Sequence, residues 1–549
     1  MLKDRAQYEN KRGRYPLSLR ARNLTRLESE TFDVLIIGGG INGAVSAAAL
    51  SARGARVALI DRGDFAGETS SNSSNLAWGG IKYLESGELL LVERLCCSRN
   101  QLMRAYPSTV REMRFLTTLQ RGFRKPAWML YAGTLLYWAL GRFHTRAPTL
   151  LSRADLKRRE QVIDDSAAVG GVEYSDCYLH DNDARFTFNF IRTAMDYDCI
   201  AANYVEAVGF ARDTRGWCID ARDRETGAPL QIRAQTLINA CGPWADSVNA
   251  EAGIDTEYHH LFSKGVHLIV DRITDSNRIL TFFASDGRLF FVIPMGPKTC
   301  IGTTDTQVDR PEATISEEDR HFILDNANHL LQLDKPLSDE DVIAERCGVR
   351  PLAVSNQGDQ TADWVRLSRQ HRIDVDRLHR HLSIYGGKLT DCLNVGEEVC
   401  RAVTELGVDL PYRKRKWYGE PHISLYREYL HQAQLMHLDA ITPASSSEKL
   451  TTRLWRRYGA SALELLEGIR ENPAWGELLI ENAEYLRGEI ELAARREMIT
   501  RLDDFLRRRS KIALVVPKEQ LLRSPGLYQA CVILFGERAE EKLAQYTDG

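Results

Sequence analysis

The chain has 549 residues, which is too long for a single hydrophobic core, so we expect two or three domains. With 44% hydrophobic and 27% charged residues, its composition is that of a soluble globular protein. Lysine and arginine number 72 against 75 aspartate and glutamate residues, and this balance argues against a general attraction to nucleic acid. The 11 cysteines are scattered without a CxxC pair, which favours reduced thiols in the cytoplasm over a metal site or a disulfide framework.

Residues 1–30 form a basic arm with no apolar core segment, so the sequence contains no secretory signal. Such an arm is either solvated or attracted to anionic lipid or a partner subunit. No stretch reaches the roughly 18 to 20 apolar residues of a membrane-spanning helix. The nearest, residues 127–141 (AWMLYAGTLLYWALG), suits a helix in the core or one lying in a membrane interface, and its spacing slightly favours the core.

Residues 31–61 predict a strand, a tight glycine turn, a helix and a second strand. An apolar run precedes Gly38, Gly40 and Gly43, and the second run ends at Asp61. The first glycine permits the turn, the second lets main chain approach a pyrophosphate, and the third lets the helix pack closely on the strand. Asp61 lies where a carboxylate can accept hydrogen bonds from an adenosine ribose. The chain is therefore predicted to bind a dinucleotide near its N-terminus.

Three later segments could bring main chain or hydroxyl groups along a long ligand. The loop TSSNSS follows Asp61, although such loops are most often simple turns; a strand runs into Gly242, and another runs into Gly386-Gly387. A helix that starts there could stabilise negative charge on a reduced flavin. Several crossings suit FAD better than the shorter NAD. The predicted cofactor-binding residues are Gly38, Gly40, Gly43, Asp61, Ser70, Ser71, Ser74, Val205, Ala240, Gly242, Gly386, Gly387, Lys388, Leu389 and Thr390.

The pattern of strand-like and helical runs divides the chain into three parts. After the basic arm (1–30), residues 31–410 mix strands and helices, and the strand-rich stretch of about 200–380 suggests a sheet over the ligand. Residues 411–549 are helical. We expect an α/β (α+β) protein: a Rossmann-like FAD-binding domain, an interleaved antiparallel-sheet substrate domain and a C-terminal helical cap domain.

Seven motifs in this order give a more specific indication: GGGINGA, TSSNSS…GGIKYLE, KGVHLIV, IGTTDT, GVRPL, LSRQHRI and YGGKLT. Their combination resembles the FAD-dependent, membrane-associated glycerol-3-phosphate dehydrogenases over residues 32–395, and more loosely beyond. The resemblance implies hydride transfer from C2 of sn-glycerol 3-phosphate to flavin N5, giving dihydroxyacetone phosphate, and electron transfer to a ubiquinone-type acceptor. It also implies peripheral attachment to the inner face of the cytoplasmic membrane; a homodimer is a further candidate assembly.

The resemblance also assigns roles to individual residues. Arg350 and Arg369 match arginines that would bind a dianionic phosphate. His267 is a candidate base, Lys388 a base or a cationic stabiliser, and Tyr83 a donor to the substrate. From the residues alone, His267 fits a core histidine better than a functional one, and Arg350 fits a surface ion pair as well as a phosphate ligand. The expected catalytic set is His267, Arg350, Lys388, Tyr83, Lys82 and Arg369.

Three residues on one loop depart from the family pattern. Asn75, Trp78 and Lys82 stand where the family has lysine, histidine and arginine. Lys82 keeps the charge but loses the bidentate fork, so a phosphate would be held less firmly. The alternative function is therefore oxidation of another small hydroxy acid, amine or polyol phosphate by an enzyme of the same superfamily.

A basic run near the C-terminus supports a hypothesis of another class. Arg507, Arg508, Arg509 and Lys511 would grip phosphates if the chain were a flavin-binding scaffold or a nucleic-acid-modifying protein. A solvated helix end or a lipid-facing patch explains the run better, so we expect no nucleic-acid partner and no metal.

Overall fold

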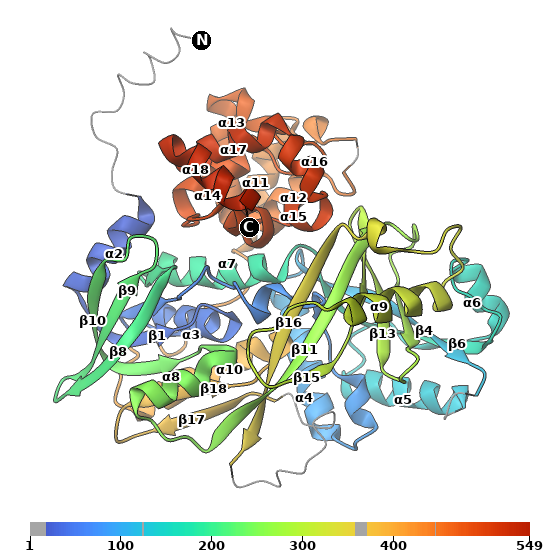
Figure 1. Ribbon diagram of the computed structural model, residues 1–549, viewed down its shortest axis with the longest axis horizontal. Helices are drawn as coiled ribbons and strands as arrows, with labels where there is room; N and C mark the ends of the chain where they lie inside the picture. Colours follow the sequence, from blue (N-terminus) through green and yellow to red (C-terminus); the bar gives the residue numbers. More distant parts are fainter. Residues whose placement is uncertain (1–17, 123–125, 357–369, 445, 549) are drawn as a thin grey trace.

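The computed structural model describes residues 18–122, 126–356, 370–444 and 446–548. Two sheets lie side by side, and the C-terminal helices form a separate layer above α7 (Figure 1). This arrangement confirms the expected α/β class with a helical C-terminal domain. No helix in these ranges is long and apolar enough to cross a membrane.

The first sheet carries the glycine turn. Its strand order is β17-β18-β10-β1-β2-β7, and the five strands from β18 to β7 run parallel. The hairpin β8–β9 pairs with β10. The bounds are β1 (Thr31–Ile37), β2 (Val57–Ile60), β7 (Ile200–Ala202), β8 (Val205–Asp213), β9 (Gly216–Asp223), β10 (Pro229–Asn239), β17 (Arg372–Asp376) and β18 (His381–Tyr385).

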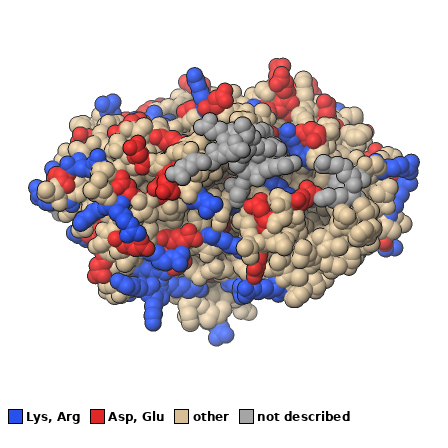
Figure 2. Space-filling model, turned by 90° about the horizontal axis from the view of Figure 1, so that it is seen from below, with Lys and Arg blue, Asp and Glu red and all other residues tan. Residues whose placement is uncertain are grey.

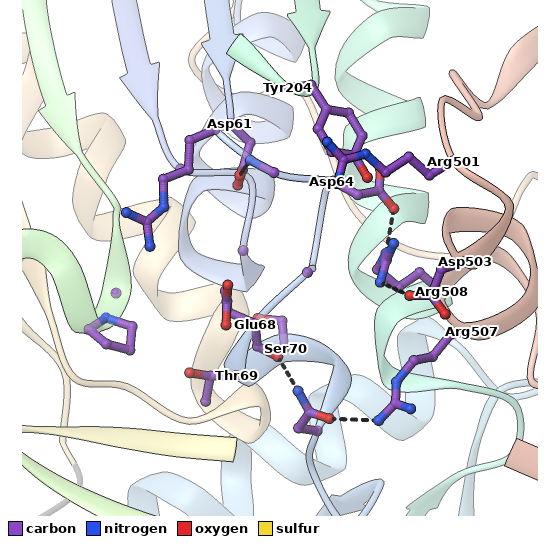
Figure 3. A pocket seen from close by; sticks show the side chains of 18 of the residues that line it. Asp61, Asp64, Glu68, Thr69, Ser70, Tyr204, Arg501, Asp503, Arg507 and Arg508 are labelled. Atoms are coloured by element: carbon purple, nitrogen blue, oxygen red, sulfur yellow. Dashed lines mark hydrogen bonds and ion pairs between the residues drawn. The ribbon is translucent and has the colours of Figure 1, made fainter. Parts of the chain in front are cut away.

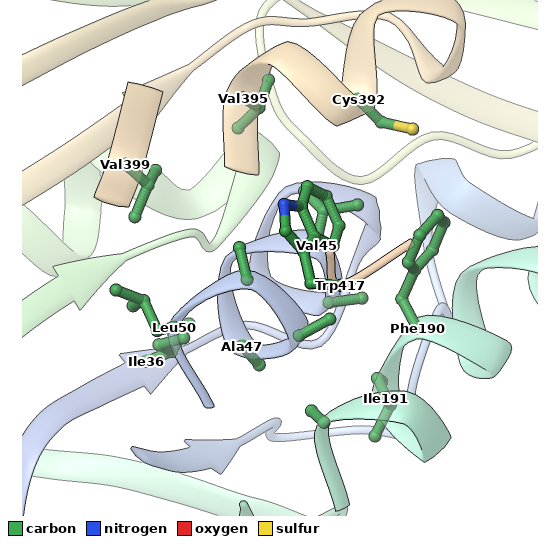
Figure 4. Packing of buried hydrophobic residues seen from close by; sticks show 14 of the residues in the cluster. Ile36, Val45, Ala47, Leu50, Phe190, Ile191, Cys392, Val395, Val399 and Trp417 are labelled. Atoms are coloured by element: carbon green, nitrogen blue, oxygen red, sulfur yellow. The ribbon is translucent and has the colours of Figure 1, made fainter. Parts of the chain in front are cut away.

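One face of this sheet is covered by α3 (Ile41–Ala52), α7 (Asp183–Asp196) and α10 (Cys392–Glu405). The helix α3 contacts both α7 and α10, and its alanines allow the close approach (Figure 4). Trp417 fills the remaining space: a Cβ on Gly396 of α10 would lie 2.6 Å from its ring. This packing fixes the helix whose N-terminus follows the glycine turn.

The second sheet has the order β15-β11-β14-β13-β12-β4-β6-β3, with β16 paired to β11 and β5 to β6. Its outer face packs on α6 (Arg153–Arg159) and α9 (Glu317–Leu330). The bounds are β3 (Leu76–Ala77), β4 (Val110–Gln120), β5 (Thr149–Leu151), β6 (Ala168–Leu179), β11 (Tyr258–Asp271), β12 (Ile279–Phe283), β13 (Leu289–Met295), β14 (Lys298–Gly302), β15 (Thr306–Val308) and β16 (Ala344–Ser355).

The C-terminal helices pack on the second sheet and on one another. The π-helix η10 (Asp504–Arg509) lies among them. The helices are α11 (Ile423–Leu435), α12 (Leu450–Tyr458), α13 (Ala462–Glu471), α14 (Arg487–Arg496), α15 (Ile512–Val515), α16 (Lys518–Arg523), α17 (Pro525–Phe535) and α18 (Ala539–Asp548).

The structure differs from three expectations. The strands of residues 200–239 belong to the first sheet, whereas β4 and β6, which lie before residue 200, belong to the second. The described part of the N-terminal arm is a helix, α2 (Leu19–Ser29), which buries Leu27 against the first sheet because its apolar side chains match that face. The segment expected in the core is α5 (Ala127–Leu140), yet only Thr134 and Tyr137 of this helix are buried, and its other residues are half-buried or exposed.

Candidate active site

The glycine turn joins β1 to α3 with no room for side chains. A Cβ on Gly38 would lie 2.4 Å from the carbonyl oxygen of Ala240, and one on Gly43 would lie 1.8 Å from that of Gly38. Gly38 also has a φ of +104°, a conformation that favours glycine. The Ser70 hydroxyl accepts a hydrogen bond from the Ile41 amide at 3.0 Å, which brings the serine loop to the N-terminus of α3. The turn thus leaves main-chain donors open to an anion.

Asp61 lies at the end of β2. Its carboxylate accepts hydrogen bonds from the amides of Gly39 (2.6 Å) and Gly63 (2.8 Å). Burial nevertheless raises its pKa to about 6, because desolvation outweighs these two hydrogen bonds. Ribose hydroxyl donors would favour the charged form, so the site suits a bound adenosine.

A cavity of about 1900 Å³ runs from this turn to the Gly386-Gly387 turn, lined by both sheets and by the C-terminal helices (Figure 3). It is large enough for a dinucleotide. Nine of the predicted cofactor residues line it: Gly38, Gly40, Asp61, Ser70, Val205, Ala240, Gly242, Gly386 and Gly387.

The other predicted cofactor residues lie outside this lining. Gly43 is beneath the turn, and the Ser71 hydroxyl donates to the carbonyl groups of its own turn, at Gly67 and Glu68. Thr390 donates to the Trp78 carbonyl oxygen at 3.2 Å, which ties two predicted loops together. The remaining three are Ser74, Leu389 and Lys388.

The paired strands β11 and β16, which we call the floor, carry alternating functional residues beside this cavity. Glu345, Cys347 and Pro351 of β16 line the cavity, whereas His267, Arg346 and Arg350 are not among its lining residues. Three cross-strand pairs face the same side: His267 with Arg346, Gly265 with Gly348, and Ser263 with Arg350. The space over the glycine pair is occupied: Asn72 lies against Gly348, where a Cβ would be 3.0 Å from the Asn72 Cβ. Because the Arg350 guanidinium lies over Gly265, a Cβ there would be 2.0 Å from its Nη2.

Arg350 is held by polar groups of a neighbouring loop. Its Nη1 lies 3.2 Å from Asp305 Oδ1, and its Nη2 donates to the Thr303 hydroxyl at 3.1 Å. Asp305 also accepts a hydrogen bond from Ser263. The guanidinium is thus fixed on the floor, and its pairing with Asp305 was not predicted from the motifs.

His267 is 2% exposed, and neither ring nitrogen has a hydrogen-bond partner among the described residues. Burial lowers its pKa to about 3, and the positive charges of Arg350 and then Arg346 add to the effect. The imidazole is therefore neutral and has a free lone pair. A core histidine with both nitrogens unsatisfied would be costly, which favours the functional interpretation.

Arg346 is a residue that the motifs did not indicate. Its side chain is 1% exposed; its Nη1 donates to the Ser73 carbonyl oxygen (2.5 Å) and to Asn75 Oδ1 (2.9 Å). Its Nε and Nη2 have no hydrogen-bond partner in the described part of the chain. A positive charge thus lies beside Asn75, at the position where the resemblance led us to expect a lysine. Arg346 and Arg350 are four residues apart on one strand, so their side chains lie on the same face. This spacing was the signal in the sequence that could have indicated Arg346.

The Gly386-Gly387 turn brings Lys388 to the same region. The Gly386 amide donates to His260 Nε2 of β11 at 3.2 Å, so the turn lies on the floor. Lys388 Nζ lies 4.4 Å from the ring centre of Tyr83 and 5.7 Å from that of Trp78. Lys388 and Tyr83 are therefore neighbours, as a shared role requires.

The catalytic set predicted from the sequence also includes Lys82 and Arg369. Lys82 Nζ lies 5.6 Å from the Tyr83 ring centre, which places it at the edge of this group. Arg369 lies outside the described residues. Within the described ranges, no cluster of histidine, cysteine and acidic side chains could hold a metal ion.

The basic run Arg507–Lys511 is neither a solvated helix end nor a lipid-facing patch. Arg508 and Arg509 are buried and pair with Asp64 of the cofactor loop. The carboxylate of Asp64 is itself buried, and the pairing of opposite charges explains why these arginines are buried with it. This run therefore offers no surface for nucleic acid.

Comparison with known proteins agrees with this geometry. The sequence model of the FAD dependent oxidoreductases matches residues 33–399, and that of the C-terminal domain of alpha-glycerophosphate oxidase matches residues 416–529. The solved glycerol-3-phosphate dehydrogenase of Bacillus halodurans, in complex with FAD, shares the fold: the TM-score is 0.69 at 24% identity, covering 97% of this chain and 96% of that one. The chain belongs to the FAD-dependent oxidoreductases, and FAD is its cofactor.

Curated relatives define the branch within this class. Glycerol-3-phosphate dehydrogenase 2 of Mycobacterium tuberculosis H37Rv is 31% identical over 510 residues, covering 90% of this chain and 83% of its own. The aerobic glycerol-3-phosphate dehydrogenase of Escherichia coli K12 is 28% identical over 503 residues, covering 90% and 96%. The chain is a member of the glycerol-3-phosphate dehydrogenase family.

Proposed function

We propose that the chain oxidises sn-glycerol 3-phosphate to dihydroxyacetone phosphate and passes the electrons to a quinone at a membrane surface. The observation that carries the proposal is the floor of β11 and β16, where a fixed guanidinium, Arg350, lies near a neutral, unpaired imidazole, His267. When bound, FAD supplies the hydride acceptor. The names of the relatives support the same substrate.

Arg350 suits the phosphate of the substrate. A guanidinium offers parallel N–H donors that match two phosphate oxygens. Asp305 and Thr303 fix its plane, and Gly265, which has no side chain, makes room for it on the floor. The phosphate would anchor one end of a three-carbon substrate and leave C2 free to react.

His267 would take the proton of the C2 hydroxyl as hydride leaves the carbon, so that the C–O single bond becomes a carbonyl. Without substrate its pKa is near 3, which makes it a weak base. A dianionic phosphate at Arg350 would cancel part of the positive field and raise that pKa on binding. Lys388, beside Tyr83, would stabilise negative charge on the oxygen during the step.

A substrate panel tests the proposal. Purified protein with an artificial electron acceptor is given sn-glycerol 3-phosphate, glycerol, a 2-hydroxy acid, an amine and another polyol phosphate. We expect turnover of sn-glycerol 3-phosphate with dihydroxyacetone phosphate as product, and no turnover of glycerol. Preference for another compound would support the alternative function suggested by Asn75, Trp78 and Lys82, and would refute ours.

We also propose peripheral attachment to the inner face of the cytoplasmic membrane; an exposed apolar surface supports the attachment, and the family resemblance suggests the face. Figure 2 views the molecule from below, the side on which α4 (Leu89–Ala105) and α5 lie in Figure 1; its lower right is largely uncharged, with basic side chains at the border. Aromatic and aliphatic side chains are enriched in such interfacial helices. The exposed residues are Leu90, Trp128, Met129, Leu135, Leu136, Phe143 and Leu150.

Sedimentation with anionic vesicles tests this attachment. We expect wild-type protein to sediment with the vesicles and the double variant Trp128→Ser, Leu136→Ser to remain in the supernatant. Leu378→Ser is the matched control, because Leu378 is exposed outside this surface. Equal binding of all three proteins would contradict attachment through α5.

A further inference from the structure

Two short loops form the adenosine end of the FAD site. Residues 61–64 follow β2, and residues 203–205 precede or begin β8. The Val205 amide donates to the Asp61 carbonyl oxygen at 2.7 Å, and the Tyr204 amide to that of Gly63 at 2.8 Å. The position of the Asp61 carboxylate therefore depends on whatever holds both loops.

The first loop, residues 61–64, is bound to the C-terminal domain through Asp64, which is buried at 3% exposure. Its carboxylate accepts hydrogen bonds from Arg508 Nε at 2.7 Å and from Arg509 Nη1 and Nη2 at 2.9 and 2.8 Å. Both arginines come from η10, and Figure 3 shows Arg508 reaching Asp64. A buried carboxylate in the cofactor loop is thus paired with charges supplied by another domain.

The second loop, residues 203–205, forms its own hydrogen bonds to the C-terminal domain. Asn203 Nδ2 donates to the Met498 carbonyl oxygen at 3.0 Å, and the Tyr204 hydroxyl donates to Asp504 Oδ1 at 2.7 Å. Arg501 and Arg507 of this domain also line the FAD cavity. Both loops at the adenosine end therefore depend on residues 498–509.

Loss of one partner would reorganise these loops, because an unpaired buried charge is strongly unfavourable. If the domain moved away, the Asp64 carboxylate would lose its guanidinium partners, and the loop would have to open to water. Opening would move Asp61, three residues earlier. By reciprocity, a ligand that needs the ordered loops must favour the docked domain by the same free energy.

We propose that the C-terminal helical domain is part of the FAD site: Arg508 and Arg509, paired with Asp64, hold the loop of Asp61 in its FAD-binding conformation, which couples domain docking to FAD binding. Both arginines are positioning residues. The inference rests on FAD binding and is independent of the substrate, so its failure leaves the proposed reaction untouched.

The test compares two buried arginines of the same domain. Arg509→Met removes a guanidinium from Asp64, whereas Arg453→Met removes one whose Nη1 donates to Ser446 within the domain. Equilibrium dialysis of the full-length apoprotein with FAD measures the Kd. We expect Arg509→Met to weaken FAD binding about tenfold or more, which corresponds to about 1.4 kcal/mol, and Arg453→Met to keep the wild-type Kd. Equal Kd values for wild type and Arg509→Met, or equal losses in both variants, would overturn the proposal.

Hydrogen exchange on wild-type protein tests the coupling without a substitution, in case Arg509→Met does not fold. We expect added FAD to slow amide exchange in residues 504–509 as well as in the glycine turn, because the bound cofactor favours the docked domain. Protection of residues 38–43 with unchanged exchange in 504–509 would refute the coupling.

Discussion

Replacing Gly265 by alanine should displace the Arg350 guanidinium without removing it. The added Cβ would lie 2.0 Å from Nη2, 2.3 Å from Cζ and 2.4 Å from Nη1, where ordinary contacts begin at 3.4 Å. The end of a flexible side chain can move away, so the fold tolerates the change, but the guanidinium must retreat by more than about 1 Å. A misplacement of that size at a positioning group can lower the rate about 100-fold.

We therefore expect Gly265→Ala to reduce kcat/KM for sn-glycerol 3-phosphate about 100-fold while the flavin content stays at the wild-type level. Steady-state kinetics and the visible spectrum measure the two quantities. Gly133→Ala is the control, because a Cβ there meets nothing within 4 Å. Unchanged kcat/KM would show that Arg350 does not bind the phosphate where it lies, and loss of FAD would show that the floor belongs to the cofactor; either result refutes the reasoning.

Three other predictions concern the cofactor, the phosphate and pH. Gly43→Ala should abolish FAD retention, because its Cβ would lie 1.8 Å from the Gly38 carbonyl oxygen; a yellow variant would contradict this. Lys82→Arg should lower KM for sn-glycerol 3-phosphate by restoring a bidentate fork, and an unchanged KM would place Lys82 away from the phosphate. His267 has a folded pKa near 3, below its unfolded value of about 6.5, so its contribution to stability is full above pH 6.5 and is lost as pH falls. Between pH 7 and 5, His267→Gln should lose about 2 kcal/mol less stability than wild type, seen as a smaller drop in the Tm of the apoprotein; equal drops would contradict the low pKa.

The nucleotide-binding half could be predicted because each of its signals is local. A strand, a glycine turn, a small-residue helix and an acid follow one another within residues 31–61, and steric exclusion at Gly38 and Gly43 enforces that order. The second sheet was harder to delimit. Its strand β4 pairs with β6 across about 50 to 70 residues and with β12 across more than 150, and no local pattern specifies such pairings.

The residues of the functional site also divide into those that motifs predicted and those that only the tertiary structure brings to the site. Arg350 and Lys388 follow motifs, and the structure brings both to the floor and its adjoining turn. Arg346 and Asp305 carry no motif, and their relation to the site depends on strand pairing and loop position.

The predictions of burial from charge and apolarity were wrong in two segments, because burial there depends on distant parts of the chain. Arg508 and Arg509 suggested an exposed patch because their partner, Asp64, lies more than 440 residues away in the chain. The apolar segment α5 suggested core, but several of its side chains, Trp128 and Leu136 among them, are exposed in the described part of the chain. In both cases burial was decided by tertiary contacts that the local sequence does not contain.

Anaerobic titration of the purified holoenzyme with sn-glycerol 3-phosphate tests the central claim most directly. We expect the visible flavin absorbance to bleach, with one equivalent of dihydroxyacetone phosphate formed for each FAD reduced. An unchanged flavin spectrum at saturating sn-glycerol 3-phosphate, in protein that dithionite reduces fully, would contradict it.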